Sequence, residues 1–138
     1  MAANRIHITT RITADIRKVW DAYLVAEPFI QFDKQSREWY CPEVQNDFQI
    51  GGKFMYHFMN QDKSFSFVFS GVYTEIIPYK KISFEFDKKR QATYIFKDLD
   101  GHTEVNIYID SDGIHSDEIQ IAGWTSVINS FKSYVEEL

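Results

Sequence analysis

The sequence predicts an α+β fold in which a curved antiparallel β-sheet wraps around a long C-terminal helix. The first observation is an apolar stripe at helical spacing between Ser116 and Leu138, a stretch that no proline interrupts. The second is a run of alternating apolar and polar residues between Ile6 and Ile109, divided by turn signals. Strands that are joined by short hairpins cannot form a parallel sheet, so we expect one antiparallel sheet.

A strand and two short helices are predicted at the start of the chain. Apolar and polar residues alternate over Arg5 to Arg11, which indicates the first strand. The first helix follows, and its apolar residues recur at helical spacing: Ile16, Val19, Trp20, Tyr23 and Leu24. Pro28 to Phe32 is expected to begin the second helix, because proline is well tolerated in a first helical turn.

The middle of the chain is predicted to contain the remaining strands. They cover Trp39 to Phe48, Phe54 to Met59, Ser64 to Ile77, Ile82 to Phe86, Ala92 to Lys97 and Val105 to Ile109. Pro42 lacks an N–H group for the ladder, so we expect the first of these strands at an edge of the sheet. In the strand ending at Ile77, the parity of the apolar residues changes midway, which predicts a β-bulge near Ser70 and Gly71.

The C-terminal helix has a recognisable start. Ser116 is the expected N-cap, and acidic residues follow it in the first turn. The apolar stripe consists of Ile121, Trp124, Val127, Ile128, Phe131, Tyr134, Val135 and Leu138. Gly123 costs about 1 kcal/mol relative to alanine inside a helix. We therefore expect that it lets the helix approach the sheet closely beside Trp124. The indole of Trp124 is then expected to project into the space enclosed by Phe54, Tyr56, Phe67, Phe69 and Phe84.

Composition limits the classes of function. At 138 residues the chain is expected to be a single domain, spanning 1–138. A net charge of -5 argues against a basic nucleic-acid-binding face, and no apolar run is long enough to cross a membrane. The first residues contain no apolar segment of a secretory signal, and the sole cysteine, Cys41, cannot form an internal disulfide. These features predict a cytoplasmic protein.

The chain shows no recognisable catalytic or metal-binding motif. His7, His57, His102 and His115 each stand alone, without the spacing of a metal site. Cys41 has no histidine near it in the sequence that could activate it as a nucleophile. We therefore assign no catalytic residue, no metal and no cofactor.

The aromatic residues are the remaining candidates for a site. The chain contains 12 Phe, 8 Tyr and 3 Trp, which indicates either a solid core of large side chains or a cavity lined by rings. A curved sheet that wraps around one helix leaves space that a ligand can occupy, which favours the cavity. The expected ligand-binding residues are Trp39, Phe54, Tyr56, Phe58, Phe67, Phe69, Phe84, Phe86, Tyr94, Trp124 and Ile128.

Four stretches match a known family in the same order along the chain. They are Ile12 to Asp15 with Val19 to Ala22, Trp39 to Pro42 with Gly51 to Phe54, Gly71 to Pro78, and Gln120 to Trp124 continued by Phe131 to Glu136. On these residues the chain resembles the homologues of the activator of the heat-shock-protein-90 ATPase, within the START and birch-pollen-allergen (SRPBCC) superfamily. The resemblance covers nearly the whole length and implies the helix-grip fold.

The resemblance leaves several functions open, because the superfamily includes lipid carriers, hormone receptors, polyketide cyclases and co-chaperones. Our first hypothesis is a non-catalytic helix-grip module that binds a small hydrophobic or aromatic ligand between the sheet and the C-terminal helix. The alternatives are a polyketide cyclase- or hydrolase-like enzyme that uses tyrosines and carboxylates, and a co-chaperone-type module that binds a chaperone. We expect a monomer or a homodimer, with neither nucleic acid nor a membrane as a partner.

Overall fold

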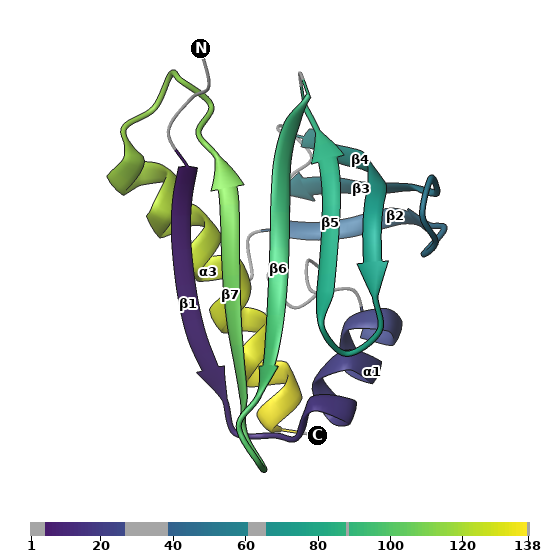
Figure 1. Ribbon diagram of the computed structural model, residues 1–138. Coiled ribbons are helices and arrows are strands. Elements are labelled where there is room, and N and C mark those ends of the chain that lie inside the picture. The colour runs from purple at the N-terminus through teal and green to yellow at the C-terminus, as the bar shows by residue number, and fades with distance from the viewer. Residues whose placement is uncertain (1–4, 27–38, 61–65, 88, 138) are drawn as a thin grey trace.

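The computed structural model describes residues 5–26, 39–60, 66–87 and 89–137 of the chain. Within these ranges the chain forms strands and helices in the predicted α+β arrangement (Figure 1). The elements, in chain order, are β1 Arg5–Ile12, α1 Ile16–Ala26, β2 Trp39–Asn46, β3 Lys53–Asn60, β4 Ser66–Ile77, β5 Lys81–Phe86, β6 Arg90–Asp98, β7 Thr103–Asp110 and α3 Asp117–Glu136. The second predicted helix, Pro28 to Phe32, lies outside the described residues.

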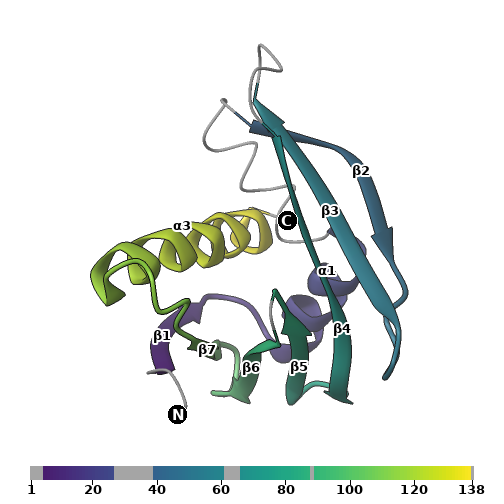
Figure 2. The same cartoon turned by 90° about the horizontal axis from the view of Figure 1, so that it is seen from above.

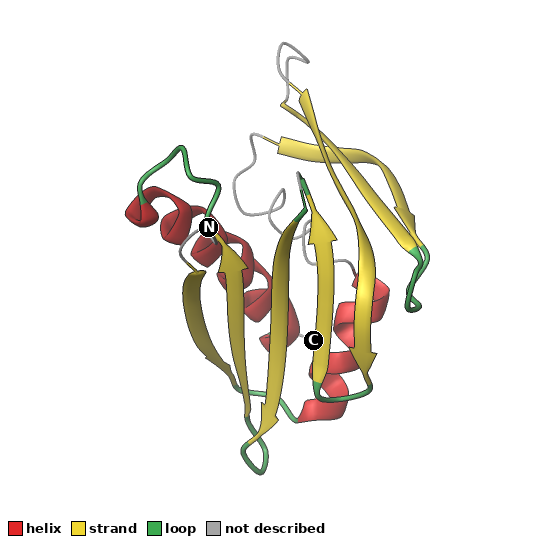
Figure 3. Cartoon of the chain, turned by 45° about the horizontal axis from the view of Figure 1, so that its top comes forward, coloured by secondary structure: helices red, strands yellow, loops and turns green. Residues whose placement is uncertain are grey.

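The strands form one antiparallel sheet in the order β1-β7-β6-β5-β4-β3-β2. Each strand from β2 to β6 pairs with the strand that follows it, and β1 pairs with β7, where Arg5 stands opposite Asp110. The sheet is curved, and α1 and α3 both lie on its concave side (Figures 2 and 3). The predicted curved antiparallel sheet around a C-terminal helix is therefore confirmed.

Alternating burial in β1 and β7 produces the apolar surface on which α3 packs. Side chains of a strand point to opposite faces in turn, and the inward set here is buried: Ile6, Ile8, Ile12, Val105, Ile107 and Ile109. From α3, Ile128, Phe131 and Val135 are buried in the same core. Tyr23 of α1 packs edge-to-face on Phe131, with 5.9 Å between ring centroids, so α1 and α3 share one apolar core.

The start of α3 agrees with the prediction, but its N-terminal half is more exposed than expected. Ser116 is the N-cap, and its hydroxyl accepts a hydrogen bond from the backbone N–H of Ile119 at 3.2 Å. Ile121, predicted on the buried stripe, is 38% exposed. The N-terminal end of α3 extends past the edge strand β1 (Figure 2), so this part of the helix has no sheet beneath it. None of the helices in the described ranges has the length and apolarity that a bilayer crossing requires.

The role predicted for Gly123 is wrong. Gly123 is exposed, and a methyl group placed on it would meet nothing within 4 Å. It therefore does not bring α3 close to the sheet. Gly123 lies in the half of α3 that extends past the sheet, so it is surrounded by solvent and not by strands.

The edge position of β2 is confirmed, since β2 is the last strand of the sheet order. The register of β2 with β3 shifts between Tyr40 and Glu43, the segment that contains Pro42. An edge strand tolerates this irregularity because, among the described strands, none pairs with its outer side.

The bulge predicted in β4 exists, but at a different residue. The ladder of β3 with β4 runs regularly through Ser70 and Gly71, whereas the register of β4 with β5 shifts between Tyr73 and Glu75. The inward series of Phe69 and Gly71 continues to Tyr73, which is 2% exposed. The parity therefore changes after Tyr73, and Thr74 is the extra residue.

Candidate functional site

An aromatic cluster fills the concave side of β3, β4 and β5. Phe54 lies at its centre, with its ring centroid 5.1 Å from that of Phe84 and 5.2 Å from that of Tyr73. The rings of Tyr56 and Phe69 lie 5.8 and 5.6 Å from Phe54. Strand pairing produces this arrangement, because inward residues of adjacent strands stand opposite each other, as Tyr56 and Phe69 do.

The space among these rings is small. Together with Tyr23 of α1 they enclose about 170 Å³ of unfilled volume, and none of it has room for a water molecule. Most of the neighbouring rings are tilted or edge-to-face, an arrangement that contributes about 0.5–1.5 kcal/mol per pair beyond burial. In this part of the described interior the rings therefore pack as a core.

Buried tyrosines bring hydroxyl groups into this core. Tyr73 donates a hydrogen bond to Asn46 Oδ1 at 2.7 Å. Tyr23 and Tyr94 are also buried, but within the described ranges their hydroxyls have no hydrogen-bond partner. Burial raises the pKa of Tyr23 and of Tyr94 well above the ordinary value, and neighbouring tyrosine hydroxyls raise it further. Both phenols therefore remain protonated at neutral pH.

A groove opens between the N-terminal half of α3 and strands β4 to β6. Its volume is about 350 Å³, and its lining residues are Val68, Phe69, Ser70, Phe86, Asp87, Arg90 and Trp124. Trp124 stands edge-on to Phe69 and to Phe86, with 6.0 Å between ring centroids in each pair. Phe69 and Phe86 lie 5.4 Å apart, so the three rings form a continuous apolar floor. We call this site the Trp124 groove.

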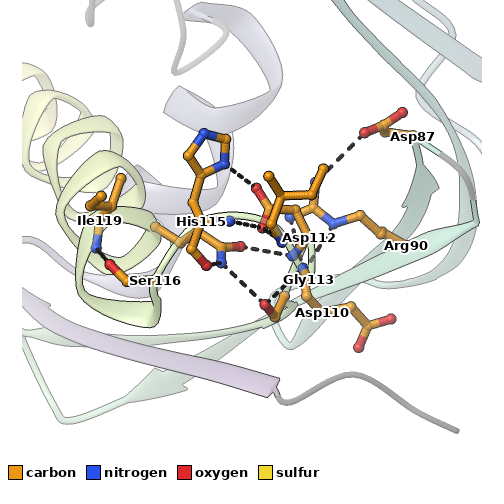
Figure 4. Close-up of polar contacts among 11 residues, drawn as sticks. Asp87, Arg90, Asp110, Asp112, Gly113, His115, Ser116 and Ile119 are labelled. Carbon is orange, nitrogen blue, oxygen red and sulfur yellow. Dashed lines mark hydrogen bonds and ion pairs between the residues drawn. The ribbon is translucent and has the colours of Figure 1, made fainter.

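Arg90 lines the Trp124 groove and supplies a positive charge there. Figure 4 shows Arg90 with Asp87 and Asp110. Its guanidinium carbon lies 4.7 Å from the centre of the Phe86 ring, a cation–π contact. Nε and Nη2 donate hydrogen bonds to the backbone oxygen of Asp110 at 3.1 and 3.0 Å. Nη1 lies 3.8 Å from a carboxylate oxygen of Asp87 in the β5–β6 turn. The groove therefore combines an apolar floor with a fixed cation.

A second polar network orders the loop between β7 and α3 (Figure 4). Asp112 accepts hydrogen bonds from the backbone N–H groups of Ile114 and His115, and His115 Nδ1 lies 2.6 Å from its carboxylate. The His115 side chain first, and then these backbone N–H groups, lower the pKa of Asp112 well below its ordinary value. Buried Gln120 donates to Ser111 Oγ and to the carbonyl of His115, and accepts from the N–H of Asp112. The network holds the start of α3 against the end of β7.

The structure divides the predicted ligand-binding residues into three groups. Phe54, Tyr56, Phe84, Tyr94 and Ile128 are buried in the core. Phe69, Phe86 and Trp124 line the groove. The side chains of Trp39, Phe58 and Phe67 lie outside what the structure describes. Among the described residues, no group of three or more histidine, cysteine, aspartate or glutamate side chains is arranged to hold a metal ion.

The predicted surroundings of Trp124 need correction. Its indole was expected in the space enclosed by Phe54, Tyr56, Phe67, Phe69 and Phe84. The structure places it against Phe69 and Phe86, at the edge of the aromatic cluster. The reason is its position along α3, because the apolar residues of this helix that are buried in the core, Ile128, Phe131 and Val135, all follow Trp124.

The predicted set of ligand-binding residues did not include Tyr23, Tyr73 and Arg90, which the structure places in the aromatic cluster or at the groove. The odd-numbered parity that Tyr73 shares with Phe69 was a signal for its inward direction. For Arg90 the signal was the turn after Phe86, because closing a hairpin there sets Phe86 and Arg90 opposite each other in the ladder. A cation directly opposite an inward phenylalanine was therefore deducible from the register.

The model of the family described as "Activator of Hsp90 ATPase homolog 1-like protein" matches residues 13–136. The chain belongs to this family. No match was found among the curated proteins.

Solved structures of similar proteins cover nearly the whole chain. The AHSA1-like protein from Aeromonas hydrophila is 29% identical, with a TM-score of 0.88 over 97% of this chain and 93% of that one. The protein Chr148 from Cytophaga hutchinsonii is 32% identical, with a TM-score of 0.79 over 98% and 94%. The Aha1 dimer from Colwellia psychrerythraea, 13% identical with a TM-score of 0.69 over 96% of each chain, shares the fold. The helix-grip fold is thus common to the family and to this chain.

Proposed function

We propose that the protein is a non-catalytic helix-grip module that binds a small apolar or aromatic molecule in the Trp124 groove. The observation that carries this proposal is the floor made by Phe69, Phe86 and Trp124 beneath about 350 Å³ of open volume. Ligand sites are typically concave and mostly apolar, with a few fixed polar groups, and have volumes of about 300–1,000 Å³.

The groove suits a compact ligand of modest affinity. Removing about 250 Å² of apolar ligand surface from water contributes about 6 kcal/mol at about 25 cal/mol per Å². The loss of translational and rotational freedom offsets part of this free energy. We therefore expect dissociation constants in the micromolar to millimolar range for simple aromatic molecules.

Trp124 provides a direct test because its indole forms part of the groove. An apolar, non-fluorescent ligand that enters should change the tryptophan emission in a saturable manner, since it displaces water from the indole. Trp20 is buried in the core at 4% exposure and is expected to contribute a constant background. In the Trp124→Phe variant, which retains a ring at this position, most of the ligand-dependent change should disappear. A panel of apolar ligands that leaves the wild-type emission unchanged would refute the proposal.

The second candidate function is an interaction with a chaperone, and the family match favours it. The family is described by its relation to the activator of the Hsp90 ATPase. We rank it second because the family match concerns the whole fold and indicates no particular surface, whereas the ligand-binding proposal is supported by the Trp124 groove. We also propose that the protein acts in the cytoplasm, since its sole cysteine suits a reducing compartment.

A further inference from the structure

We propose that the Trp124 groove selects molecules that carry a carboxylate on a compact apolar body, and that Arg90 recognises this carboxylate. The inference rests on the proposed function of the groove and specifies the chemical class of its ligand. It follows from how Arg90 is held, from which of its donors are in use, and from the charges around it.

Arg90 is fixed before any ligand arrives. Its side chain is 19% exposed, its guanidinium stacks on Phe86, and two of its nitrogens donate to the backbone oxygen of Asp110. A long side chain normally loses rotamer freedom when it binds a ligand, at a cost of about 0.5–1.5 kcal/mol. Here folding has already ordered the side chain, so its donors are available at little further cost.

Part of the guanidinium remains open to a new acceptor. A guanidinium has five N–H donors. Two are used by Asp110, and the 3.8 Å separation of Nη1 from Asp87 is too long for a hydrogen bond. The side chain of Asp87 is 65% exposed, so this ion pair is loose and screened by water. A ligand carboxylate can therefore take the position beside Nη1 that Asp87 now approaches.

The nearby charges leave the positive charge of Arg90 largely uncompensated. Both carboxylate oxygens of Asp110 are engaged by other groups, since one pairs with Arg5 Nε at 3.2 Å and the other accepts from the backbone N–H of Gln91 at 2.9 Å. Arg90 donates its two hydrogen bonds to the neutral backbone oxygen of Asp110 and not to this carboxylate. Among the residues that line the groove, Asp87 is therefore the carboxylate that competes with an incoming anion for Arg90.

The apolar floor determines the rest of the ligand. Phe69, Phe86 and Trp124 offer ring faces and edges, which favour a flat aromatic body. A bicyclic aromatic acid fits a volume of about 350 Å³, with its carboxylate at the Arg90 rim. Bidentate pairing of a guanidinium with a carboxylate adds orientation to this binding.

The test compares 2-naphthoate with its neutral counterpart 2-naphthamide, by isothermal titration calorimetry at pH 7.5 and low salt. Wild-type protein should bind the acid about ten-fold more tightly than the amide, which is typical of a hydrogen bond to a charged group. Arg90→Gln should reduce this ratio to about one. Asp87→Asn removes the competing carboxylate from an exposed position and should increase the ratio several-fold.

Lys89→Gln is the matched control, because it removes one positive charge from the same turn at an exposed residue outside the groove. It should leave the ratio near that of the wild type. Equal affinity for acid and amide in the wild type would overturn the role of Arg90 while leaving the groove as an apolar site. Failure of both ligands to bind would overturn the groove function itself. If Arg90→Gln unfolds, an unchanged ratio in Asp87→Asn would still overturn the inference.

Discussion

Gly71→Ala tests whether the aromatic cluster is as tightly packed as the structure indicates. Gly71 lies on the inward face of β4, directly opposite Phe54 in the ladder. A methyl group at this position would lie 2.7 Å from Cζ and 2.9 Å from Cε2 of Phe54, and it would overlap the backbone oxygen of Glu85. Carbon atoms in ordinary contact are about 3.7 Å apart, so the Phe54 ring would have to move by about 1 Å, and the backbone would have to shift as well to relieve the overlap with Glu85.

The ring of Phe54 has little freedom to make that movement. It is 3% exposed and is surrounded by Tyr56, Phe69, Tyr73 and Phe84. Overpacking of this kind costs about 1–3 kcal/mol, and the lower backbone entropy of alanine in the unfolded chain offsets about 0.5–1 kcal/mol. We expect a net loss of about 1–2 kcal/mol of unfolding free energy. For a domain of this size the melting temperature should fall by roughly 5 °C.

Gly123→Ala is the control, because it adds the same methyl group where nothing lies within 4 Å. It should stabilise the protein by about 1 kcal/mol, since alanine is the better helix former. Both variants can be measured by urea unfolding followed by circular dichroism. A Gly71→Ala variant as stable as the wild type would show that the cluster is loosely packed and that its rings can make room for a ligand.

Two further predictions concern polar groups. Tyr94→Phe should leave the unfolding free energy unchanged or raise it by up to about 1 kcal/mol, because the buried hydroxyl of Tyr94 has no partner in the described ranges. Tyr73→Phe should lower the unfolding free energy by about 1 kcal/mol, because it removes the hydrogen bond to Asn46. A Tyr73→Phe variant that melts at a higher temperature than Tyr94→Phe would contradict this prediction. For Asp112, a folded-state pKa below the unfolded value means a stabilisation that is present above about pH 4 and lost as the pH falls further. The stability difference between wild type and Asp112→Asn should therefore shrink from pH 7 to pH 3 in urea titrations, and a difference that does not change with pH would refute it.

The order of elements could be predicted because its signals are local. Val105, Ile107 and Ile109 are buried in β7 as their alternation requires. Asp100 and Gly101, a residue pair that favours a tight hairpin turn, have φ angles of 61° and 95°, the positive values that a type I′ turn needs. Each of these signals depends on a few neighbouring residues and not on what packs against them.

The misplaced features depend on contacts between distant segments. The position of the bulge follows from Tyr73, whose ring packs on Phe54 and whose hydroxyl reaches Asn46. The parity that Tyr73 shares with Phe69 signalled its inward direction, but a tyrosine can face either side of a sheet, so this signal alone did not locate the bulge. The surroundings of Gly123 depend on how far α3 extends past β1, which helical periodicity cannot specify.

The candidate site, like the fold, could be predicted only in part from local sequence signals. Inward parity identified both Phe54 and Phe86 as interior aromatics, and both are buried. Their different roles come from what covers them, since Phe54 is covered by other rings, whereas Phe86 meets Trp124 and Arg90 at the groove. The residues that cover a strand come from other elements of the fold, so the alternation pattern of the strand does not predict them.

Phe69 links the packed core to the groove and limits what can bind there. Its ring lies 5.6 Å from Phe54 in the core and 6.0 Å from Trp124 in the groove. A ligand that passed from the groove toward Phe54 by way of Phe69 would have to displace this ring from both partners, and each lost aromatic pair would cost about 0.5–1.5 kcal/mol. A long apolar chain that crosses the interior would meet this cost, whereas a compact molecule held at the Arg90 rim would not. The packing of Phe69 therefore favours small ligands bound at the rim.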